Sequence, residues 1–590
     1  MKTFFAIVLT LGLLASAGFA QPTITQVSNA ASSALTPLPN SAIAQGSYFA
    51  IYGSGFGSDT TVCGSSYENC FWTPYPLPTN IKGTSVSVTV GGTTVPAYIE
   101  FAAKISPTYS QINAVLPSTT PTGTGTLTVT TNGATSAAFP VTVAASSVGT
   151  FAVNQAGTGP GVITDAKYQF ITPFHTAKPG DFLILWGTGL GPAPDTSTEG
   201  TAPPAQTNLC STPSSCPVTV WVAGQKASVQ YAGRSGFTAE DQIVFIVPPG
   251  VQGCYVQVAV QTGSVVGNFT SMSVDPNGAT CSDADGIDYN SISAMVGTKG
   301  QAKVGAISML SNYLNLKLTG LSALQWDNDT VSGEIGTFTQ GQLNSFQSFT
   351  LAPSVGNCAV SPFLQYPPPT DPVLSSVAYL DAGSSLSIQG PNGTKPVALN
   401  SNGKGYSALV GGATIAQLIS GGGGAPFFLS PTFGISSGTY TVTAPGGADV
   451  GPFTASITVP SSAASFQWTN QPTGAISRSS PLTITWTGGD PNGFVDITAI
   501  SSTLASGIVP PPGTPGILVE CIAPASTGSF TIPTYVLQSL ASTAGSTAIE
   551  PPGELLVGPA SAPVKATTPT GLDALYIFYH YIQGLNVTWQ

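Results

Sequence analysis

Hydrolytic chemistry needs a histidine base or a pair of carboxylates, and this sequence offers few motifs for either. His175 and His580 are the two histidines, and no G-x-S-x-G nucleophile elbow accompanies them. We expect both to have a structural role, packed against tyrosine side chains. Glycosidases use two carboxylates about 5–10 Å apart. Five isolated acidic residues are candidates for such a pair: Glu100, Glu240, Asp241, Glu334 and Glu520. Without a supporting motif, the sequence predicts that the protein is not an enzyme and uses no cofactor.

Two glycine triplets raise the question of phosphate binding. They end the segments FAIYGSGFG (49–57) and FLILWGTGLG (182–191). A dinucleotide loop needs G-x-G-x-x-G followed by a helix, but Ser58 and Pro192 occupy the third glycine position. We therefore interpret the glycines as bends at strand ends, where backbones pass closely. Alternation then predicts core-facing side chains at Phe49, Ile51, Phe182 and Ile184.

Metal binding has equally weak support. Asp283, Asp285 and Asp288 resemble part of a calcium loop, but the glycine comes too early and no distal Glu follows. We expect these carboxylates to form Asx turns. The cysteines form no CxxC motif, and two histidines make a zinc site improbable. No metal is predicted.

The eight cysteines instead indicate disulfides in an oxidising compartment. Cys63 with Cys70 and Cys210 with Cys216 are close pairs. The other four candidates are Cys254, Cys281, Cys358 and Cys521. A bond between the last two could join separate blocks of the chain, although eight cysteines allow 105 connectivities.

The N-terminus predicts export. Lys2 is followed by an uncharged apolar stretch, and small residues precede Gln21, which indicates a signal peptide cleaved after Ala20. The alternative is an uncleaved anchor. No apolar run of about 20 residues follows, so we expect no membrane span in the mature protein. We expect a secreted or cell-surface protein.

Composition favours an all-β fold. Charged residues make up 7% of the chain, while Gly (68) and Pro (50) are abundant. The helix formers Glu, Lys and Arg are scarce, and the apolar runs are rich in Val, Ile, Thr, Tyr and Phe, which favour strands. The 14 Lys and Arg residues and the net charge of −11 argue against nucleic-acid binding.

A repeat organises the first half of the chain. AIAQGSYFAIYGSGFG (42–57) matches TAKPGDFLILWGTGLG (176–191), so that Tyr52 corresponds to Trp186. VSVTVGG recurs as VTVWVAG, and QINAVLP (111–117) recurs as QIVFIVP (242–248). The period of about 130 residues is that of a domain.

These motifs resemble the IPT/TIG immunoglobulin-like domains. The set NAAS (29–32), GSYFAIYGSGFG and QINAVLP (111–117) also resembles the Solibacter-type C-terminal domain of secreted Acidobacteria proteins. The resemblance covers roughly residues 25–275 and is looser in the second copy. It implies tandem Ig-like β-sandwiches at a surface location, and it brings no catalytic residues.

The predicted organisation divides the chain into seven parts. A proline-rich break, QYPPPTDP (365–372), marks one boundary, and strand-rich blocks follow it. The parts are a signal peptide (1–20), Ig-like domains (21–145 and 146–275), a linker (276–300), β-rich domains (301–375 and 376–460) and a C-terminal Ig-like domain (461–590).

An aromatic loop is the candidate ligand platform. Phe71, Trp72 and Tyr75 lie among prolines beside the first cysteine pair, and a rigid loop with exposed rings suits ligand binding. The alternative is that these rings cover the end of their own sandwich. The sequence predicts a non-catalytic structural or adhesive module whose partner is another surface protein or an extracellular polysaccharide. Polysaccharide binding, or an accessory role in glycan hydrolysis, is the alternative function.

Overall fold

The computed structural model describes most of the chain after residue 20. The described residues are 21–590 except 73, 193–199, 201–205, 279, 285, 317–323, 347–352, 365–375, 415–416, 418–435, 507–510, 512 and 549–551. The predicted signal peptide (1–20) and the proline-rich break (365–372) lie outside the described residues. In the described part, no helix is long and apolar enough to cross a membrane.

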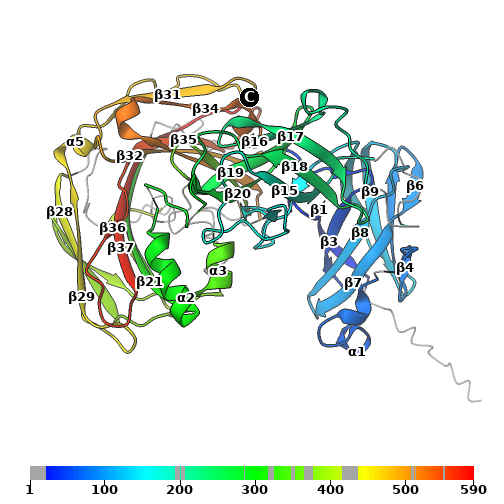
Figure 1. Cartoon of the computed structure of the whole chain (residues 1–590), viewed down its shortest axis with the longest axis horizontal. Coiled ribbons are helices and arrows are strands. Elements are labelled where there is room, and N and C mark those ends of the chain that lie inside the picture. Colours follow the sequence, from blue (N-terminus) through cyan, green and yellow to red (C-terminus); the bar gives the residue numbers. More distant parts are fainter. Residues whose placement is uncertain are drawn as a thin grey trace, which may run out of the picture.

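The first Ig-like sandwich lies at one end of the molecule (Figure 1, blue). One sheet has the order β1 (Thr23–Asn29), β3 (Tyr48–Ser54), β8 (Tyr109–Val115), β7 (Tyr98–Ser106). The other has the order β2 (Ile43–Ala44), β11 (Phe139–Ala144), β9 (Gly123–Thr131), β5 (Thr84–Val90), β4 (Asn80–Ile81), with β6 (Thr93–Pro96) on β5 and β10 (Ala134–Thr135) on β9. Alternate residues of TSVSVTV in β5 are buried, so one face of each sheet forms the core between them.

The second Ig-like sandwich repeats this plan in the middle of the molecule. Its strands follow the order β12 (Gly149–Thr150), β15 (Phe182–Thr188), β18 (Asp241–Ile246), β17 (Gln225–Arg234), β16 (Val218–Val222), β19 (Gly253–Thr262), β20 (Val265–Val274), β13 (Gly159–Pro160), with β14 (Ile163–Thr164) on β15. Leu183 and Leu185 of β15 face the core, whereas Phe182 is 54% exposed. The predicted core positions Phe49 and Ile51 are correct. The prediction for Phe182 is wrong, because the core-facing side chains of this strand are offset by one residue. Ile184 is buried, at 8% exposure, but it lies outside the core cluster of Leu183 and Leu185.

The glycine triplets are strand-end bends in both copies. A Cβ at Gly53 would lie 1.9 Å from the Thr23 carbonyl oxygen, and one at Gly187 would lie 2.3 Å from that of Gly149. The backbones therefore pass too closely for any other residue. A short helix, α1 (Thr60–Cys63), does follow the first triplet, but the Asp59 side chain accepts a hydrogen bond from its Thr61 amide. Its amide end is thus capped from within the chain.

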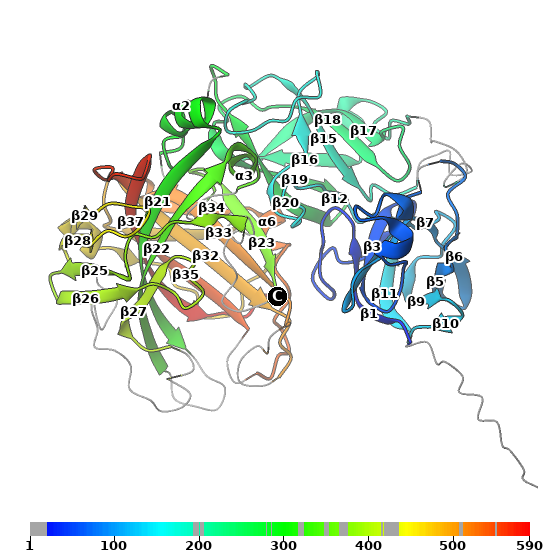
Figure 2. The ribbon, with the colours of Figure 1, turned by 90° about the horizontal axis from the view of Figure 1, so that it is seen from below.

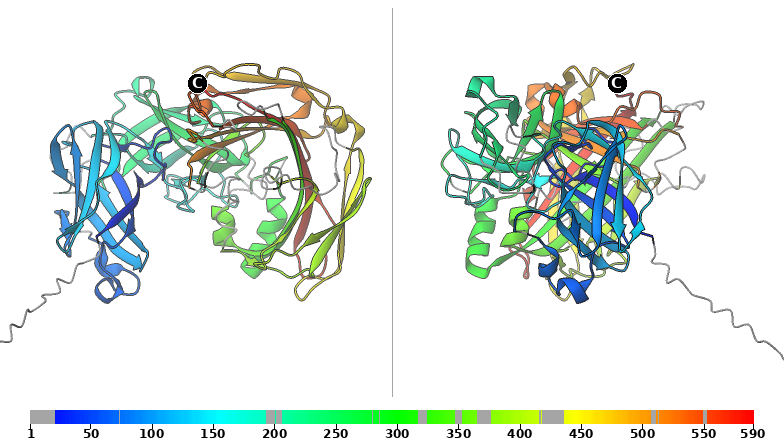
Figure 3. Two further views of the ribbon diagram at one scale, coloured as in Figure 1. Left: turned by 180° about the vertical axis from the view of Figure 1, so that it is seen from behind. Right: turned by 90° about the vertical axis from the view of Figure 1, so that its right-hand side faces the viewer.

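The rest of the chain is built on one large curved sheet (Figure 3, left). Its order is β23 (Cys358–Phe363), β33 (Gly516–Pro524), β32 (Phe494–Ser502), β35 (Gly553–Ala560), β37 (Ala574–Asn586), β21 (Gln301–Leu316), β22 (Leu324–Thr339), β24 (Ala378–Tyr379), with β27 (Tyr406–Gly412) on β22 and β36 (Val564–Lys565) on β37. Strands β32 and β35 are buried along their whole length, because both faces of the sheet are covered.

Two small sheets pack on the outside of this curve. One is β26 (Gly393–Ala398), β25 (Ser385–Gly390), β28 (Gly438–Ala444), β29 (Phe453–Val459); the other is β30 (Gln467–Trp468), β31 (Leu482–Thr487), β34 (Ser529–Ile532). Each encloses its own core against the large sheet. The predicted divisions at 375/376 and 460/461 therefore do not match the sheet, since strands from all three predicted blocks share it. Their pairings join residues far apart in sequence, which composition does not reveal.

Helices cover part of the inner face of the large sheet. Helix α2 (Tyr289–Lys299) is capped by Asp288 and buries Tyr289, Ile292 and Val296. The prediction of a linker over 276–300 is therefore wrong for its second half. The other short helices in the described part of the chain are α3 (Gln340–Ser345), α5 (Ser461–Ala464), α6 (Thr534–Leu537), η1 (Glu68–Cys70), η3 (Pro213–Ser215) and η5 (Ala525–Thr527).

The cysteines form disulfides in the predicted close pairs and between the remaining candidates. The bonds are Cys63–Cys70, Cys210–Cys216, Cys254–Cys281 and Cys358–Cys521. The last joins the adjacent strands β23 and β33. The second sandwich also contacts the C-terminal half directly, because Tyr535 of α6 stacks on Trp221 with ring centroids 4.5 Å apart. Figure 2 shows the second sandwich between the first one and the large sheet.

Candidate functional site

The predicted aromatic platform does not form a single surface. Phe71 is 49% exposed and packs against Phe101, with ring centroids 4.5 Å apart. Trp72 is 41% exposed, and its Nε1 donates to the Pro76 carbonyl 3.2 Å away. Tyr75 is half-buried, and its hydroxyl is hydrogen-bonded to Thr238 of the second sandwich. Two of the three rings are therefore exposed on the loop, while the third belongs to the contact between the sandwiches.

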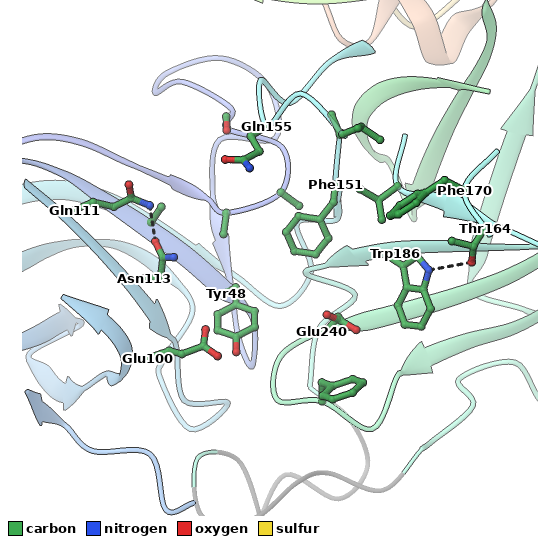
Figure 4. A pocket seen from close by; sticks show the side chains of 18 of the residues that line it. Tyr48, Glu100, Gln111, Asn113, Phe151, Gln155, Thr164, Phe170, Trp186 and Glu240 are labelled. Atoms are coloured by element: carbon green, nitrogen blue, oxygen red, sulfur yellow. Dashed lines mark hydrogen bonds between the residues drawn. The ribbon is translucent and has the colours of Figure 1, made fainter. Parts of the chain in front are cut away.

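A cleft of about 900 Å³ lies between the two Ig-like sandwiches (Figure 4). Five exposed large hydrophobic side chains line it, out of twelve in the described part of the chain. They are Tyr109, Val153, Tyr168, Phe170 and Phe237, with exposed fractions of 36–66%. Exposed apolar surface gathered in one concave place is typical of a binding site.

The first wall of the cleft is the outer face of the sheet formed by β3 and β8. Ile51 and Ile112 are paired neighbours that point into the core. The strand period of two therefore turns Tyr52 and Gln111, also paired, toward the cleft. Asn113 follows Gln111 on the same face and accepts a hydrogen bond from it at 2.9 Å.

The second wall belongs to the second sandwich. Trp186 extends from β15 and donates to Thr164 Oγ1, 3.3 Å away, which fixes the indole. Trp186 corresponds to Tyr52 in the sequence repeat, so the same outward position of both copies faces the cleft. In the same way, Glu240 lines the cleft at the position that corresponds to Tyr109.

A rigid turn carries two of the exposed rings of this wall, Tyr168 and Phe170. Asp165 Oδ1 accepts from the amides of Lys167 and Gln169 at 2.8 and 2.9 Å. His175 Nε2 lies 3.3 Å from Asp165 Oδ2 on the other side of the carboxylate. Tyr168 within this turn has a φ of 61°, an uncommon conformation for a bulky residue. Residues in such conformations gather at ligand sites.

Two of the isolated acids predicted from sequence meet in this cleft. Burial raises the pKa of Glu100, and a hydrogen bond from Tyr48 opposes the rise. Burial also raises the pKa of Glu240, with Asp241 and Glu100 adding to the rise. Ser235 Oγ donates to Glu240 at 3.0 Å.

The other predicted acids lie elsewhere. Asp241 is buried against Arg234, while Glu334 and Glu520 are on the large sheet. His580 is also on that sheet, where its Nδ1 lies 3.0 Å from Asp496 Oδ2 and its ring packs edge-on against Phe578. The ring contact of His580 is therefore with a phenylalanine, whereas packing against tyrosine was expected.

Buried polar contacts fix the two walls relative to each other. Arg234 is 2% exposed and donates from Nη2 to the carbonyls of Gly46 and Gly191 at 2.7 and 2.8 Å, while its Nη1 pairs with Asp241. Asn29, from the NAAS motif, donates to the Ser147 carbonyl at 2.9 Å. The cleft is therefore preformed, which lowers the entropic cost of binding a ligand.

The structure provides no arranged metal site in its described part, because no group of His, Cys, Asp and Glu is placed to hold an ion there. Asp283 accepts hydrogen bonds from the Cys254 amide and Ser354 Oγ at 2.6 and 2.9 Å. Asp288 caps α2, as an Asx-type interaction. Asp285 lies outside the described residues.

Most of the cleft was not predicted from the sequence. Tyr52 and Trp186 occupy equivalent positions of the repeat, and this equivalence is the signal that both side chains point outward. The alternation of QINAVLP also indicated that Gln111 and Asn113 face away from the core. Nothing in the sequence indicated that the two outward faces lie opposite each other.

The architecture is that of a multidomain protein with tandem Ig-like β-sandwiches. Residues 31–144 match the family model of the IPT/TIG domain. A search of curated protein sequences found no match.

Among solved structures, the chain is similar to the S-layer protein rSbsC(31-844), with 12% identity, a TM-score of 0.18, and coverage of 95% of this chain and 54% of that one. The chain is also similar to the Bacteroides ovatus glucan-utilisation protein SGBP-B in complex with a mixed-linkage heptasaccharide. The identity is 11%, the TM-score is 0.12, and the match covers 79% of this chain and 78% of that one. For the Escherichia coli adhesin FdeC, the identity is 10%, the TM-score is 0.13, and the match covers 74% of this chain and 95% of that one. The chain spans about half the length of the S-layer structure. Similarities this low say nothing about its ligand.

Proposed function

We propose that this chain is a non-catalytic surface or secreted β-sandwich protein that binds an extracellular polysaccharide in the cleft. The observation that carries the proposal is the concentration of exposed rings in a preformed cavity of ligand size. An adhesive role follows if the glycan belongs to another cell or to a matrix.

The chemistry of the cleft suits a sugar. A pyranose ring has apolar C–H faces and a rim of hydroxyls, so it combines well with aromatic rings beside amides and carboxylates. Tyr168 and Phe237 supply exposed ring faces. Gln111, Asn113 and Glu240 supply donors and acceptors on both walls.

Location at the surface has two independent supports. Every cysteine is paired in a disulfide, which fits an oxidising compartment. The apolar N-terminus predicts export. We also propose that the first two domains belong to the Solibacter-type family, since Asn29 of NAAS and Asn113 of QINAVLP lie at the domain contact and the cleft.

The test is a polysaccharide screen of the mature chain, followed by substitutions. Tyr168→Ala combined with Phe237→Ala should weaken the affinity for the best glycan at least tenfold without unfolding, because both rings are about two-thirds exposed. The matched control is Phe182→Ala, an exposed ring of β15 outside the cleft, which should change the affinity less than twofold. Equal losses in both variants, or no binding to any glycan, would refute the proposal.

One observation favours a second candidate, hydrolysis of the bound glycan. Glu100 and Glu240 share the cleft, and burial raises the pKa of each, as a general acid requires. The discriminating measurement is mass spectrometry of oligosaccharides after long incubation. Shortened products that disappear in Glu240→Gln, with binding retained, would establish the hydrolase. Intact oligosaccharides would favour binding alone.

A further inference from the structure

The cleft walls carry charge of one sign. Among the described residues that line it, the ionisable side chains of Glu and Tyr occur, and Lys, Arg and His do not. Both carboxylates, Glu100 and Glu240, are half-buried on opposite walls. The nearby cation Arg234 is buried and already paired with Asp241, so it offers no charge to a ligand.

From this arrangement we propose that the cleft selects uncharged glycans and excludes polysaccharides that carry carboxylate or sulfate groups. The inference rests on the proposed function and adds the class of glycan. An anionic sugar entering the cleft would lose hydration and meet two carboxylates at short range, where partial burial strengthens the repulsion.

An uncharged sugar meets the opposite situation. Its hydroxyls donate to the carboxylates of Glu100 and Glu240, and hydrogen bonds to ionised acceptors are stronger than neutral ones. Gln111 and Asn113 add further hydrogen-bonding atoms to the cleft. The hydrogen bond between their amides uses Gln111 Nε2 and Asn113 Oδ1. Gln111 Oε1 can therefore accept from a sugar hydroxyl, and Asn113 Nδ2 can donate to one. Neutral, hydroxyl-rich chains can thus satisfy the polar atoms of both walls, whereas anionic chains cannot.

The first experiment is an immobilised panel of matched polysaccharides. It pairs neutral glucans, xylans and galactans with the same backbones oxidised to uronates or sulfated. We expect the mature chain to bind at least one neutral member, with at least tenfold weaker binding to its anionic counterpart at 50 mM salt. Raising the salt to 500 mM should narrow this difference, because salt screens repulsion. Stronger binding to an anionic member would overturn the inference and leave the proposed function intact. No binding to any member would refute both.

The second experiment locates the selectivity. Glu100→Gln combined with Glu240→Gln should reduce the neutral-to-anionic affinity ratio at least tenfold. The control is Asp59→Asn combined with Glu68→Gln, which makes the same change in net charge on exposed residues outside the cleft. The control should leave the ratio within twofold of the wild type. An equal effect in both variants would assign the selectivity to overall charge and overturn the inference. If the first variant does not fold, the salt dependence decides.

Discussion

The disulfide loop (residues 58–79) and the interdomain cleft both expose aromatic rings, but they are constructed differently. The loop is held by Cys63–Cys70, seven residues apart, and its exposed rings Phe71 and Trp72 are neighbours in sequence. The cleft collects rings from two domains, and these rings are spread along the sequence from Tyr48 to Phe237. Its shape depends on contacts between domains. A ring-rich segment is thus easy to recognise in sequence, whereas a site built from two domains is not.

The largest effect should come from breaking the contact that fixes the cleft. Arg234→Met leaves Asp241 buried without its partner and removes two hydrogen bonds to backbone carbonyls. Removing one member of a buried ion pair costs about 3–5 kcal/mol. We expect a loss of this size in urea unfolding followed by tryptophan fluorescence, and at least tenfold weaker glycan binding, although Arg234 does not line the cleft.

The control for this variant is Lys226→Met on the same strand. Lys226 is exposed and lies over the Trp221 ring, 5.2 Å from its centroid, a contact worth about 0.5–1 kcal/mol at an exposed site. Glycan binding should not change. If both variants lose the same stability and binding, the cleft does not depend on the buried arginine.

Opening the disulfide loop should separate stability from binding. Cys63→Ser with Cys70→Ser removes a short cross-link, and the chain-entropy model assigns about 2–3 kcal/mol to a loop of this length. We expect that loss of unfolding free energy in the first sandwich, with glycan affinity unchanged within twofold. Calorimetry gives the stability and affinity electrophoresis gives the binding. A tenfold loss of affinity would show that the loop and the cleft are one site.

The contribution of the first wall is tested by Tyr109→Ala. This ring is 41% exposed at the start of β8 and stacks on Tyr52, with centroids 6.1 Å apart. Losing a ring contact to the glycan should weaken binding about tenfold, which corresponds to about 1.4 kcal/mol. The free energy of unfolding should change little. Unchanged affinity would restrict the site to the second sandwich, and the cleft would no longer be a two-domain site.

Much of the fold was predictable because it depends on local patterns. The glycine triplets and the alternation in VSVTVGG specify strand ends and buried faces, and the all-β fold with tandem sandwiches follows from them. The close cysteine pairs were equally local. The shared large sheet was not predictable, because β21 and β37 pair in parallel through residues 270 positions apart, such as Val304 and Ala574. The cleft was not predictable for the same reason, since its shape depends on how one domain is oriented against the other.

A carboxylate of the cleft, Glu240, and one of the disulfide loop, Asp59, should contribute to protein stability with opposite dependence on pH. The pKa of Glu240 is raised, chiefly by burial. The contribution of this carboxyl to the stability of the folded protein is therefore fully present below its pKa in the unfolded chain, near 4.5. The contribution is lost as the pH rises through the pKa in the folded protein. The pKa of Asp59 is lowered, chiefly by hydrogen bonding to Thr61, so its contribution is present above 3.8 and is lost as pH falls.

Unfolding in urea between pH 3 and pH 7 measures both responses. Relative to wild type, Glu240→Gln should gain stability as pH increases above about 4.5. Asp59→Asn should lose stability at neutral pH, and its difference from wild type should shrink as the pH falls toward 3. A stability difference for Glu240→Gln that stays constant from pH 3 to pH 7 would mean that this carboxylate is solvated like an ordinary surface glutamate.

The smallest effect is expected for the rings that sequence favoured. Phe71→Ala with Trp72→Ala removes two exposed side chains, yet neither lines the cleft. Their contacts are local, with Phe101 and with the Pro76 carbonyl, as expected if they cover the end of their own sandwich. Glycan affinity should stay within twofold of wild type in the same assay that detects Tyr109→Ala. If this variant instead lost retention while Tyr109→Ala kept it, the ligand would bind to the loop, and the cleft would be only the joint between two domains.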